Sequence, residues 1–163
     1  NRLMAPRPAA ATVLVGLLVI ALAGCASPQG ATFTSVRAHA QEAVADVVAA
    51  LPDGAEFTPT GDPTSTACDS GTAGPSGPEG TAFATFHGSA VLPDTADTGA
   101  VLTELPTTLG EEWAVEPVGI DTDVATVRVN RAGTGVSVDV TEQAGDGPKT
   151  LDILAVSPCG RIE

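Results

Sequence analysis

His87 and Ser89 are the residues whose types come nearest to those of a hydrolytic site. Nucleophilic catalysis needs a hydroxyl or thiol, a base that takes its proton, and a group that orients the base. The two residues stand two positions apart in a His-Gly-Ser sequence. At that spacing in a strand their side chains lie side by side and cannot form a catalytic arrangement by themselves. A site that uses His87 would therefore need an acidic residue from a distant part of the chain. A small envelope hydrolase that uses His87 is therefore the alternative interpretation of this chain.

Metal and phosphate sites have less support. Asp121 and Asp123 have the spacing that begins a calcium loop, but the third oxygen ligand, the glycine and the closing glutamate are missing. The glycine-rich stretch 69–80 contains no lysine, whereas a phosphate-binding loop needs Gly-Lys-Ser/Thr at the start of a helix. The sequence contains no Cys-x-x-Cys pair and no histidine next to a cysteine, so a zinc site has little support. We predict no cofactor and no metal.

The N-terminal stretch has the layout of a secretory signal. Arg2 and Arg7 precede an apolar run that ends at Gly24 in small residues. The run is about 15 residues long, which is short of the roughly 20 residues that span a bilayer. It also lacks the polar face of an ordinary surface helix. Residues 1–24 are therefore predicted to be a signal peptide.

The apolar run ends in Leu22-Ala23-Gly24-Cys25, which resembles the lipobox of bacterial lipoproteins. The resemblance implies cleavage just before Cys25 and a diacylglyceryl group on its sulfur. Such a group carries two acyl chains, enough for stable anchoring. With its bias to small and polar residues and its closing Ser157-Pro158-Cys159, the chain is similar to small actinobacterial lipoproteins of unknown function. The expected location is the extracytoplasmic face of the cell membrane.

The two other cysteines, Cys68 and Cys159, remain as a pair if Cys25 carries lipid. In an oxidising compartment a disulfide is the usual state of such a pair. It would close a loop of 91 residues (159 − 68). The chain-entropy model assigns such a loop roughly 4–5 kcal/mol, as an upper-end figure. Two free thiols, or a pair of metal ligands, are the alternatives.

The charge balance excludes one class of partner. The chain has 7 basic and 20 acidic residues, and Arg2 and Arg7 leave with the signal. The mature chain therefore has 5 basic residues against 20 acidic ones, a net charge of −15. Phosphate backbones and anionic headgroups repel such a surface. Nucleic-acid binding is excluded on this ground, and the acyl chains must hold the protein at the membrane.

The first segment with helical periodicity runs from about residue 34 to 51. Thr34 or Ser35 is the expected N-cap, and Pro52 ends the segment. Its apolar residues recur every three or four positions and predict one buried stripe: Val36, Ala40, Val44, Val47, Val48 and Leu51.

A second helix is predicted after Asp97 or Thr98, the candidate caps, and should end at Gly110. Pro106 is expected to kink it. The inward residues are Val101, Leu102, Leu105 and Leu109.

Strands are predicted by period-two patterns and turn residues. They are residues 55–68, interrupted by prolines, then 81–92 and 113–120, then a hairpin of 124–130 and 135–141, then 151–155. In the stretch 81–92 the even-numbered residues are expected to face the helices. The order is helix, two strands, helix and a four-strand meander. It predicts an α+β two-layer sandwich with two helices on one face of an antiparallel sheet of five to six strands.

The predicted organisation is a signal peptide (1–24), a lipidated tether (25–32) and a single domain (33–163). The function that we expect is a non-enzymatic binding or interaction module, anchored to the membrane through Cys25. Its partner is an envelope protein, a lipid or a wall component. Exposed apolar residues around Phe83 and Val91 on one sheet face would support this expectation.

Overall fold

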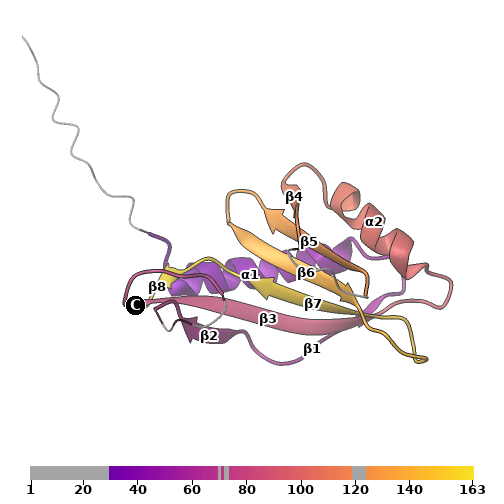
Figure 1. The fold of residues 1–163 in the computed structure, drawn as a ribbon, viewed down its shortest axis with the longest axis horizontal. Helices are drawn as coiled ribbons and strands as arrows, with labels where there is room; N and C mark the ends of the chain where they lie inside the picture. The colour runs from indigo at the N-terminus through magenta and orange to yellow at the C-terminus, as the bar shows by residue number, and fades with distance from the viewer. Residues whose placement is uncertain (1–29, 70, 72–73, 119–123) are drawn as a thin grey trace, which may run out of the picture.

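In the computed structural model, the described residues are 30–69, 71, 74–118 and 124–163. They form two helices and one antiparallel sheet (Figure 1). The elements in chain order are α1 (Phe33–Ala49), β1 (Glu56–Pro59), β2 (Thr64–Ala67), β3 (Thr81–Val91), α2 (Thr98–Leu109), β4 (Trp113–Glu116), β5 (Thr126–Arg131), β6 (Val136–Glu142), β7 (Thr150–Val156) and β8 (Gly160–Arg161).

The α+β class and the antiparallel sheet are confirmed, but the sheet has eight strands and not five to six. The strand order is β1-β3-β7-β6-β5-β4, with β2 and β8 also paired to β3. The predicted strand 55–68 is two strands, β1 and β2, because Pro59, Gly61 and Pro63 interrupt it. The other additional strand, β8, has two residues and is too short to leave a pattern.

Helix α1 buries the predicted stripe but begins earlier than predicted. Thr32 is the N-cap, and its side chain accepts a hydrogen bond of 3.2 Å from the backbone N–H of Ser35. The predicted caps, Thr34 and Ser35, lie inside the helix. Thr32, Thr34 and Ser35 all carry a hydroxyl that can cap a helix. The contact of Thr32 with Arg161 of β8 therefore helps to select where the helix begins.

Helix α2 has the predicted boundaries. The side chain of Asp97 caps it by accepting a 2.7 Å hydrogen bond from the N–H of Ala100. Gly110 ends it with a φ of 91°, a left-handed conformation that favours glycine. Leu102 and Leu105 are buried, whereas Val101 and Leu109 are partly buried against the core.

The core lies between the helices and one face of the sheet. Residues paired across antiparallel strands share a face, and the register aligns Val129, Val138 and Ala155 in one such row. All three are fully buried, as are Val140 and Ile153 of the next row. Both helices contribute side chains to this cluster, so they cover the same face. The even-numbered residues of β3 lie on this side, as predicted.

The opposite face of the sheet, which we call the helix-free face, carries mainly polar side chains. His87, Asp152, Arg128 and Asp139 belong to it, because each is one residue removed from a core-facing position. One end of this face is covered. There the chain at Gly74 passes over the ring of Phe83, since a Cβ on Gly74 would lie 2.7 Å from the ring.

Candidate functional site

Cys25 lies outside the described residues, so its lipidation stays a prediction. The described chain begins at Gly30 and is joined at once to the C-terminal strand. The carbonyl of Ala31 accepts a 2.8 Å hydrogen bond from the N–H of Arg161, and Thr32 forms a bridge with the same residue. No helix among the described residues is long and apolar enough to cross a bilayer. The described chain thus enters the domain beside β8.

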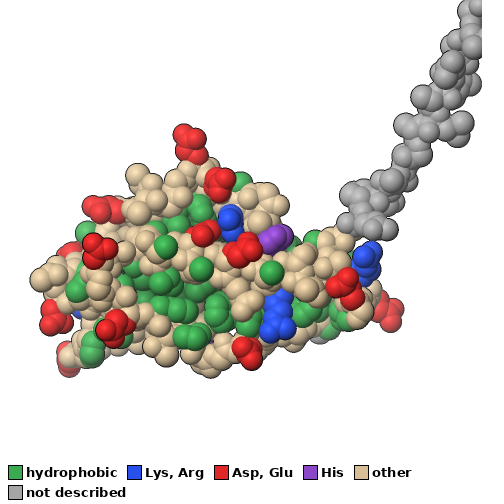
Figure 2. Space-filling view, turned by 180° about the vertical axis from the view of Figure 1, so that it is seen from behind, with side chains coloured by type: hydrophobic (Ala, Val, Ile, Leu, Met, Phe, Trp, Pro, Cys, Tyr) green, Lys and Arg blue, Asp and Glu red, His purple; other side chains and the backbone are tan. Residues whose placement is uncertain are grey.

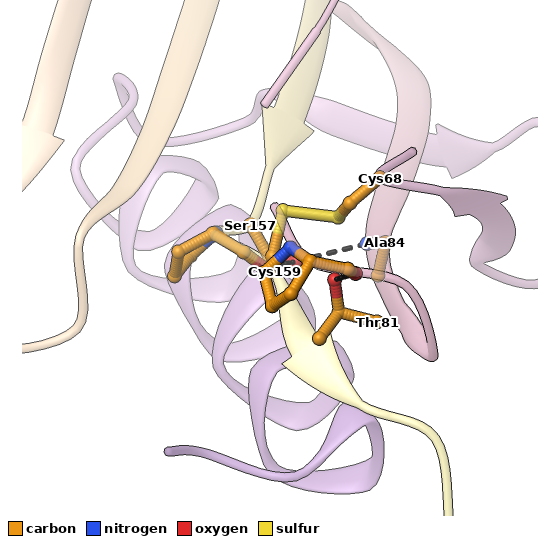
Figure 3. Close-up of a disulfide and its surroundings, with 7 residues drawn as sticks. Cys68, Thr81, Ala84, Ser157 and Cys159 are labelled. Atoms are coloured by element: carbon orange, nitrogen blue, oxygen red, sulfur yellow. Dashed lines mark hydrogen bonds between the residues drawn. A yellow bond between two sulfur atoms is a disulfide. The ribbon is translucent and has the colours of Figure 1, made fainter. Parts of the chain in front are cut away.

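The predicted pair of cysteines forms a disulfide. Cys68 and Cys159 are joined by an S–S bond of 2.15 Å, with 6.3 Å between their Cα atoms (Figure 3). Cys68 follows β2 and Cys159 follows β7, so the bond ties the outer strand β2 to the end of the chain. Cys68 is buried, and its N–H donates to the carbonyl of Thr81.

A buried serine beside the disulfide was not singled out from the sequence. Ser157 is fully buried, and its Oγ accepts a 2.9 Å hydrogen bond from the N–H of Ala84 (Figure 3). The same Oγ lies 2.8 Å from the carbonyl of Pro158, to which it donates. Both bonds are internal, so Ser157 holds the turn that positions Cys159.

His87 has a hydroxyl on one ring nitrogen and a carboxylate near the other. Thr60 Oγ1 lies 3.3 Å from Nδ1, and Asp152 Oδ1 lies 3.6 Å from Nε2. Ser89, the nucleophile considered from the sequence, donates instead to Asp152, at 3.2 Å. The hydroxyl, imidazole and carboxylate of a catalytic relay are therefore present with Thr60 in place of Ser89.

The surroundings of this relay are open. The side chains of His87 and Asp152 are 45% and 38% exposed, and Thr60 is exposed. The adjoining hollow has a volume of about 210 Å³ and is lined by threonines, Gly61, Asp62 and His87. The N–H of Thr60 already donates to the carbonyl of His87, so it is not available to stabilise an oxyanion. The site resembles a catalytic relay in connectivity but lacks exclusion of water.

An ion pair occupies the middle of the helix-free face. Arg128 donates to both carboxylate oxygens of Asp139, at 2.5 and 2.7 Å. The pKa of Arg128 is raised above its ordinary value, mainly by the hydrogen bonds to Asp139 and less by the negative charges of Asp139 and Glu116. Burial of the guanidinium acts in the opposite direction and lowers this pKa. Ser137 connects Asn130 to Glu116 by hydrogen bonds of 3.2 and 3.3 Å. This polar face is internally paired, as a solvated sheet face usually is.

The exposed apolar cluster expected around Phe83 and Val91 is not formed. Phe83 is buried because the chain at Gly74 covers it, and only Val91 is exposed. The other exposed large apolar residues of the described chain, Val115 and Ile162, belong to β4 and the C-terminal end. The helix-free face therefore has no apolar docking patch around these two residues.

A cleft of about 400 Å³ lies where the C-terminal ends of both helices meet the sheet. Arg131 and Trp113 pair across β5 and β4 and line it, with Asp46 and Glu112 as its carboxylates. The remaining walls are mostly small or apolar: Ala49, Ala50, Thr108 and Leu109.

Arg131 is held inside the cleft by α1. Its Nη1 and Nη2 lie 3.6 Å from Glu42 Oε2 and 3.3 Å from Asp46 Oδ2, respectively. Nη1 is buried and has no hydrogen bond within the described part of the chain. Arg131 falls between the two predicted hairpin strands, 124–130 and 135–141, but it is the last residue of β5. Its two-residue spacing from Val129 was the signal that it lies on the core face.

The described residues contain no group of three or more His, Cys, Asp or Glu side chains placed to hold a metal. The aspartates 121 and 123, considered for calcium, lie outside the described residues.

No family model, no curated protein and no solved structure matches this chain.

Proposed function

We propose that this protein is a lipid-anchored binding module on the extracytoplasmic face of the cell membrane, with no catalytic role. In this proposal a diacylglyceryl group on Cys25 holds the domain at the membrane. The module binds another component of the envelope, which is a protein, a lipid or a wall component.

The observation that carries the proposal is the Cys68–Cys159 disulfide. Disulfides persist in oxidising compartments and are rare in the cytosol. The pair therefore supports export, which the N-terminal segment predicts independently. The lipobox-like ending at Cys25 adds the anchor.

The geometry suits a module that presents its cleft away from the membrane. Ala31 and Thr32 are joined to β8, so a chain anchored at Cys25 has only residues 25–30 as a free tether. Six extended residues reach about 20 Å. The cleft lies at the other end of α1, whose 17 residues extend about 25 Å.

The anchor is tested with Cys25→Ala. We expect the variant to keep its uncleaved signal and to lack the diacylglyceryl mass on its N-terminal peptide. The measurement is mass spectrometry of the protein from membrane and culture fractions. An inhibitor of lipoprotein signal peptidase should likewise prevent cleavage. Normal processing and membrane retention of Cys25→Ala would contradict the anchor.

Binding is tested by native mass spectrometry of the exported Cys25→Ser form. Additional mass that disappears on denaturation identifies a bound lipid or small molecule. A bare mass followed by specific cross-links in the envelope identifies a protein partner. A bare mass without specific cross-links would contradict a binding role.

The alternative is a small envelope hydrolase, and the contacts of Thr60, His87 and Asp152 favour it over other enzyme classes. Hydrolysis of a chromogenic acetate ester should then fall with His87→Ala and with Thr60→Val. Ser89→Ala is the matched control, because Ser89 touches Asp152 and not the imidazole. We expect all variants to match the small background of the parent protein, and a selective loss in the first two would replace our proposal with this one.

A further inference from the structure

We infer that the cleft between the helix ends and β4 binds a cationic group on an apolar stem, either an organic amine or the side chain of a lysine. This inference rests on the proposed binding role and names the class of ligand. It is argued from the cleft's volume, its charges and its walls.

The charges of the cleft favour a cation. Its one guanidinium, that of Arg131, already faces Glu42 and Asp46 on α1. Glu112 adds a further carboxylate to the lining and is exposed. An anion would have to compete with Glu42 and Asp46 for Arg131, whereas a cation meets Glu112, whose carboxylate forms no ion pair with another described residue.

The two helices add to this potential. The C-terminal end of a helix carries a partial negative charge, which cations stabilise. Both α1 and α2 end beside the cleft, and neither has a basic residue in its last turn. Natural helices often neutralise this end with a lysine or arginine of their own. Arg131 of β5 already lies beside Asp46 in the last turn of α1, so a ligand can supply the charge that the end of α2 lacks.

The walls require an apolar stem behind the charge. The apolar lining residues of the cleft are Ala49, Ala50, Leu109 and the largely buried Trp113. The volume of about 400 Å³ is that of a small-ligand pocket. A short alkyl chain that ends in an ammonium group matches both the apolar walls and the carboxylates at the rim.

The test uses Trp113, the only tryptophan of the chain, as a fluorescent reporter inside the cleft. The purified full mature protein, in non-ionic detergent, is titrated at constant ionic strength with 1,5-diaminopentane. Glutarate, a five-carbon chain with carboxylates at both ends, is the matched probe of opposite charge. We expect a saturable change in emission with the diamine and none with glutarate.

Variants locate the binding. Asp46→Asn with Glu112→Gln should weaken diamine binding by about tenfold or more, the effect of losing a charge-assisted hydrogen bond. Glu104→Gln should leave it unchanged, because Glu104 is an exposed residue of α2 outside the cleft lining. Circular dichroism verifies that each variant is folded.

The outcomes separate the sources of the cation and the two proposals. Binding of Nα-acetyl-lysine methylamide as strong as that of the diamine indicates a lysine of a partner protein, and binding of the diamine alone indicates a free polyamine. Preference for glutarate, no saturable change, or equal weakening by Glu104→Gln would overturn the inference. If another ligand is then found by native mass spectrometry, the binding role stands without the cation site.

Discussion

Gly88 lies on the core face of β3 directly beneath the ring of Phe57. A Cβ at this position would lie 2.3 Å from the ring and 2.8 Å from the carbonyl oxygen of Thr58. The ring could rotate away, but the backbone oxygen is fixed by the pairing of β1 with β3. The glycine between His87 and Ser89 thus serves the packing of β1, not a catalytic turn.

Gly88→Ala is expected to destabilise the domain by about 1–3 kcal/mol, because overpacking displaces β1. Urea unfolding measures the change in the free energy of unfolding. Gly147→Ala is the control, since its Cβ would meet no atom within 4 Å. Equal stability of the two variants would show that β1 shifts without cost.

The ion pair of Arg128 and Asp139 is the second feature at the residue scale. Asp139→Asn removes a carboxylate that is 24% exposed and leaves the guanidinium of Arg128 37% exposed. Because water reaches both groups, we expect a loss of only about 1 kcal/mol in the free energy of unfolding. Urea unfolding at pH 7 measures this, and Glu111→Gln, at an exposed position, should change stability by less than half as much.

The same pair predicts a pH dependence. The folded-state pKa of Arg128 is raised, so its contribution is fully present below the unfolded pKa and is lost only as pH rises through the folded value. Both values lie far above neutrality. Between pH 7 and 10 the difference between the parent and Asp139→Asn should therefore stay constant, and a difference that disappears in this range would contradict it.

At the scale of elements, one long strand organises the sheet. The 11 residues of β3 pair with β1 and β2 along one edge and with β7 and β8 along the other. The short strands β2 and β8 lie at the end where the disulfide closes the chain. Short edge strands with few buried side chains open easily, so this end depends on the covalent bond.

Replacing both Cys68 and Cys159 by alanine should cost about 2–5 kcal/mol in the free energy of unfolding. Hydrogen exchange should localise the effect. The amides of Cys68 and Arg161 are expected to show the largest increase in exchange rate. The amides of the β5–β6–β7 pairs should exchange faster only to the extent that the global stability falls. Uniform acceleration throughout the sheet would show that the bond acts on global stability alone.

At the scale of the whole molecule, acidic side chains far outnumber basic ones. Figure 2 shows Asp and Glu side chains around the domain and only a few Lys or Arg. Of the five basic residues after Cys25, Arg128 and Arg131 are in ion pairs, and Lys149 donates to the carbonyls of Asp94 and Ala96. The excess charge is therefore self-repelling, which opposes the compact state.

Added salt should stabilise the domain, because it screens many repulsions and few attractions. Between 10 and 300 mM NaCl the screening length falls from about 30 Å to below 8 Å. We expect Tm to rise by about 2–4 °C, corresponding to roughly 1 kcal/mol in a domain of this size. Scanning calorimetry measures this, and a fall in Tm would show that the ion pairs outweigh the repulsion.

The local patterns of the sequence determined most of the secondary structure. The apolar stripe of α1, the cap and stop of α2, and the alternation in β6 and β7 are properties of neighbouring residues, so they can be predicted without tertiary contacts. The pairing of Cys68 with Cys159 followed from how few thiols remained after Cys25. The predicted strand count was wrong for two reasons. Prolines divide one extended segment into β1 and β2, and the two-residue strand β8 is defined by its pairing with β3 and not by a pattern of its own.

Only the tertiary structure decided which side chains meet. Thr60 approaches His87 because β1 pairs with β3, and Phe83 is buried because the chain passes over its ring at Gly74. The cleft combines two helix ends with one residue each from β4 and β5. Such contacts depend on register and packing between segments that are far apart in the chain. Periodicity within a segment carries no information about them, whereas it is sufficient for the helices and strands themselves.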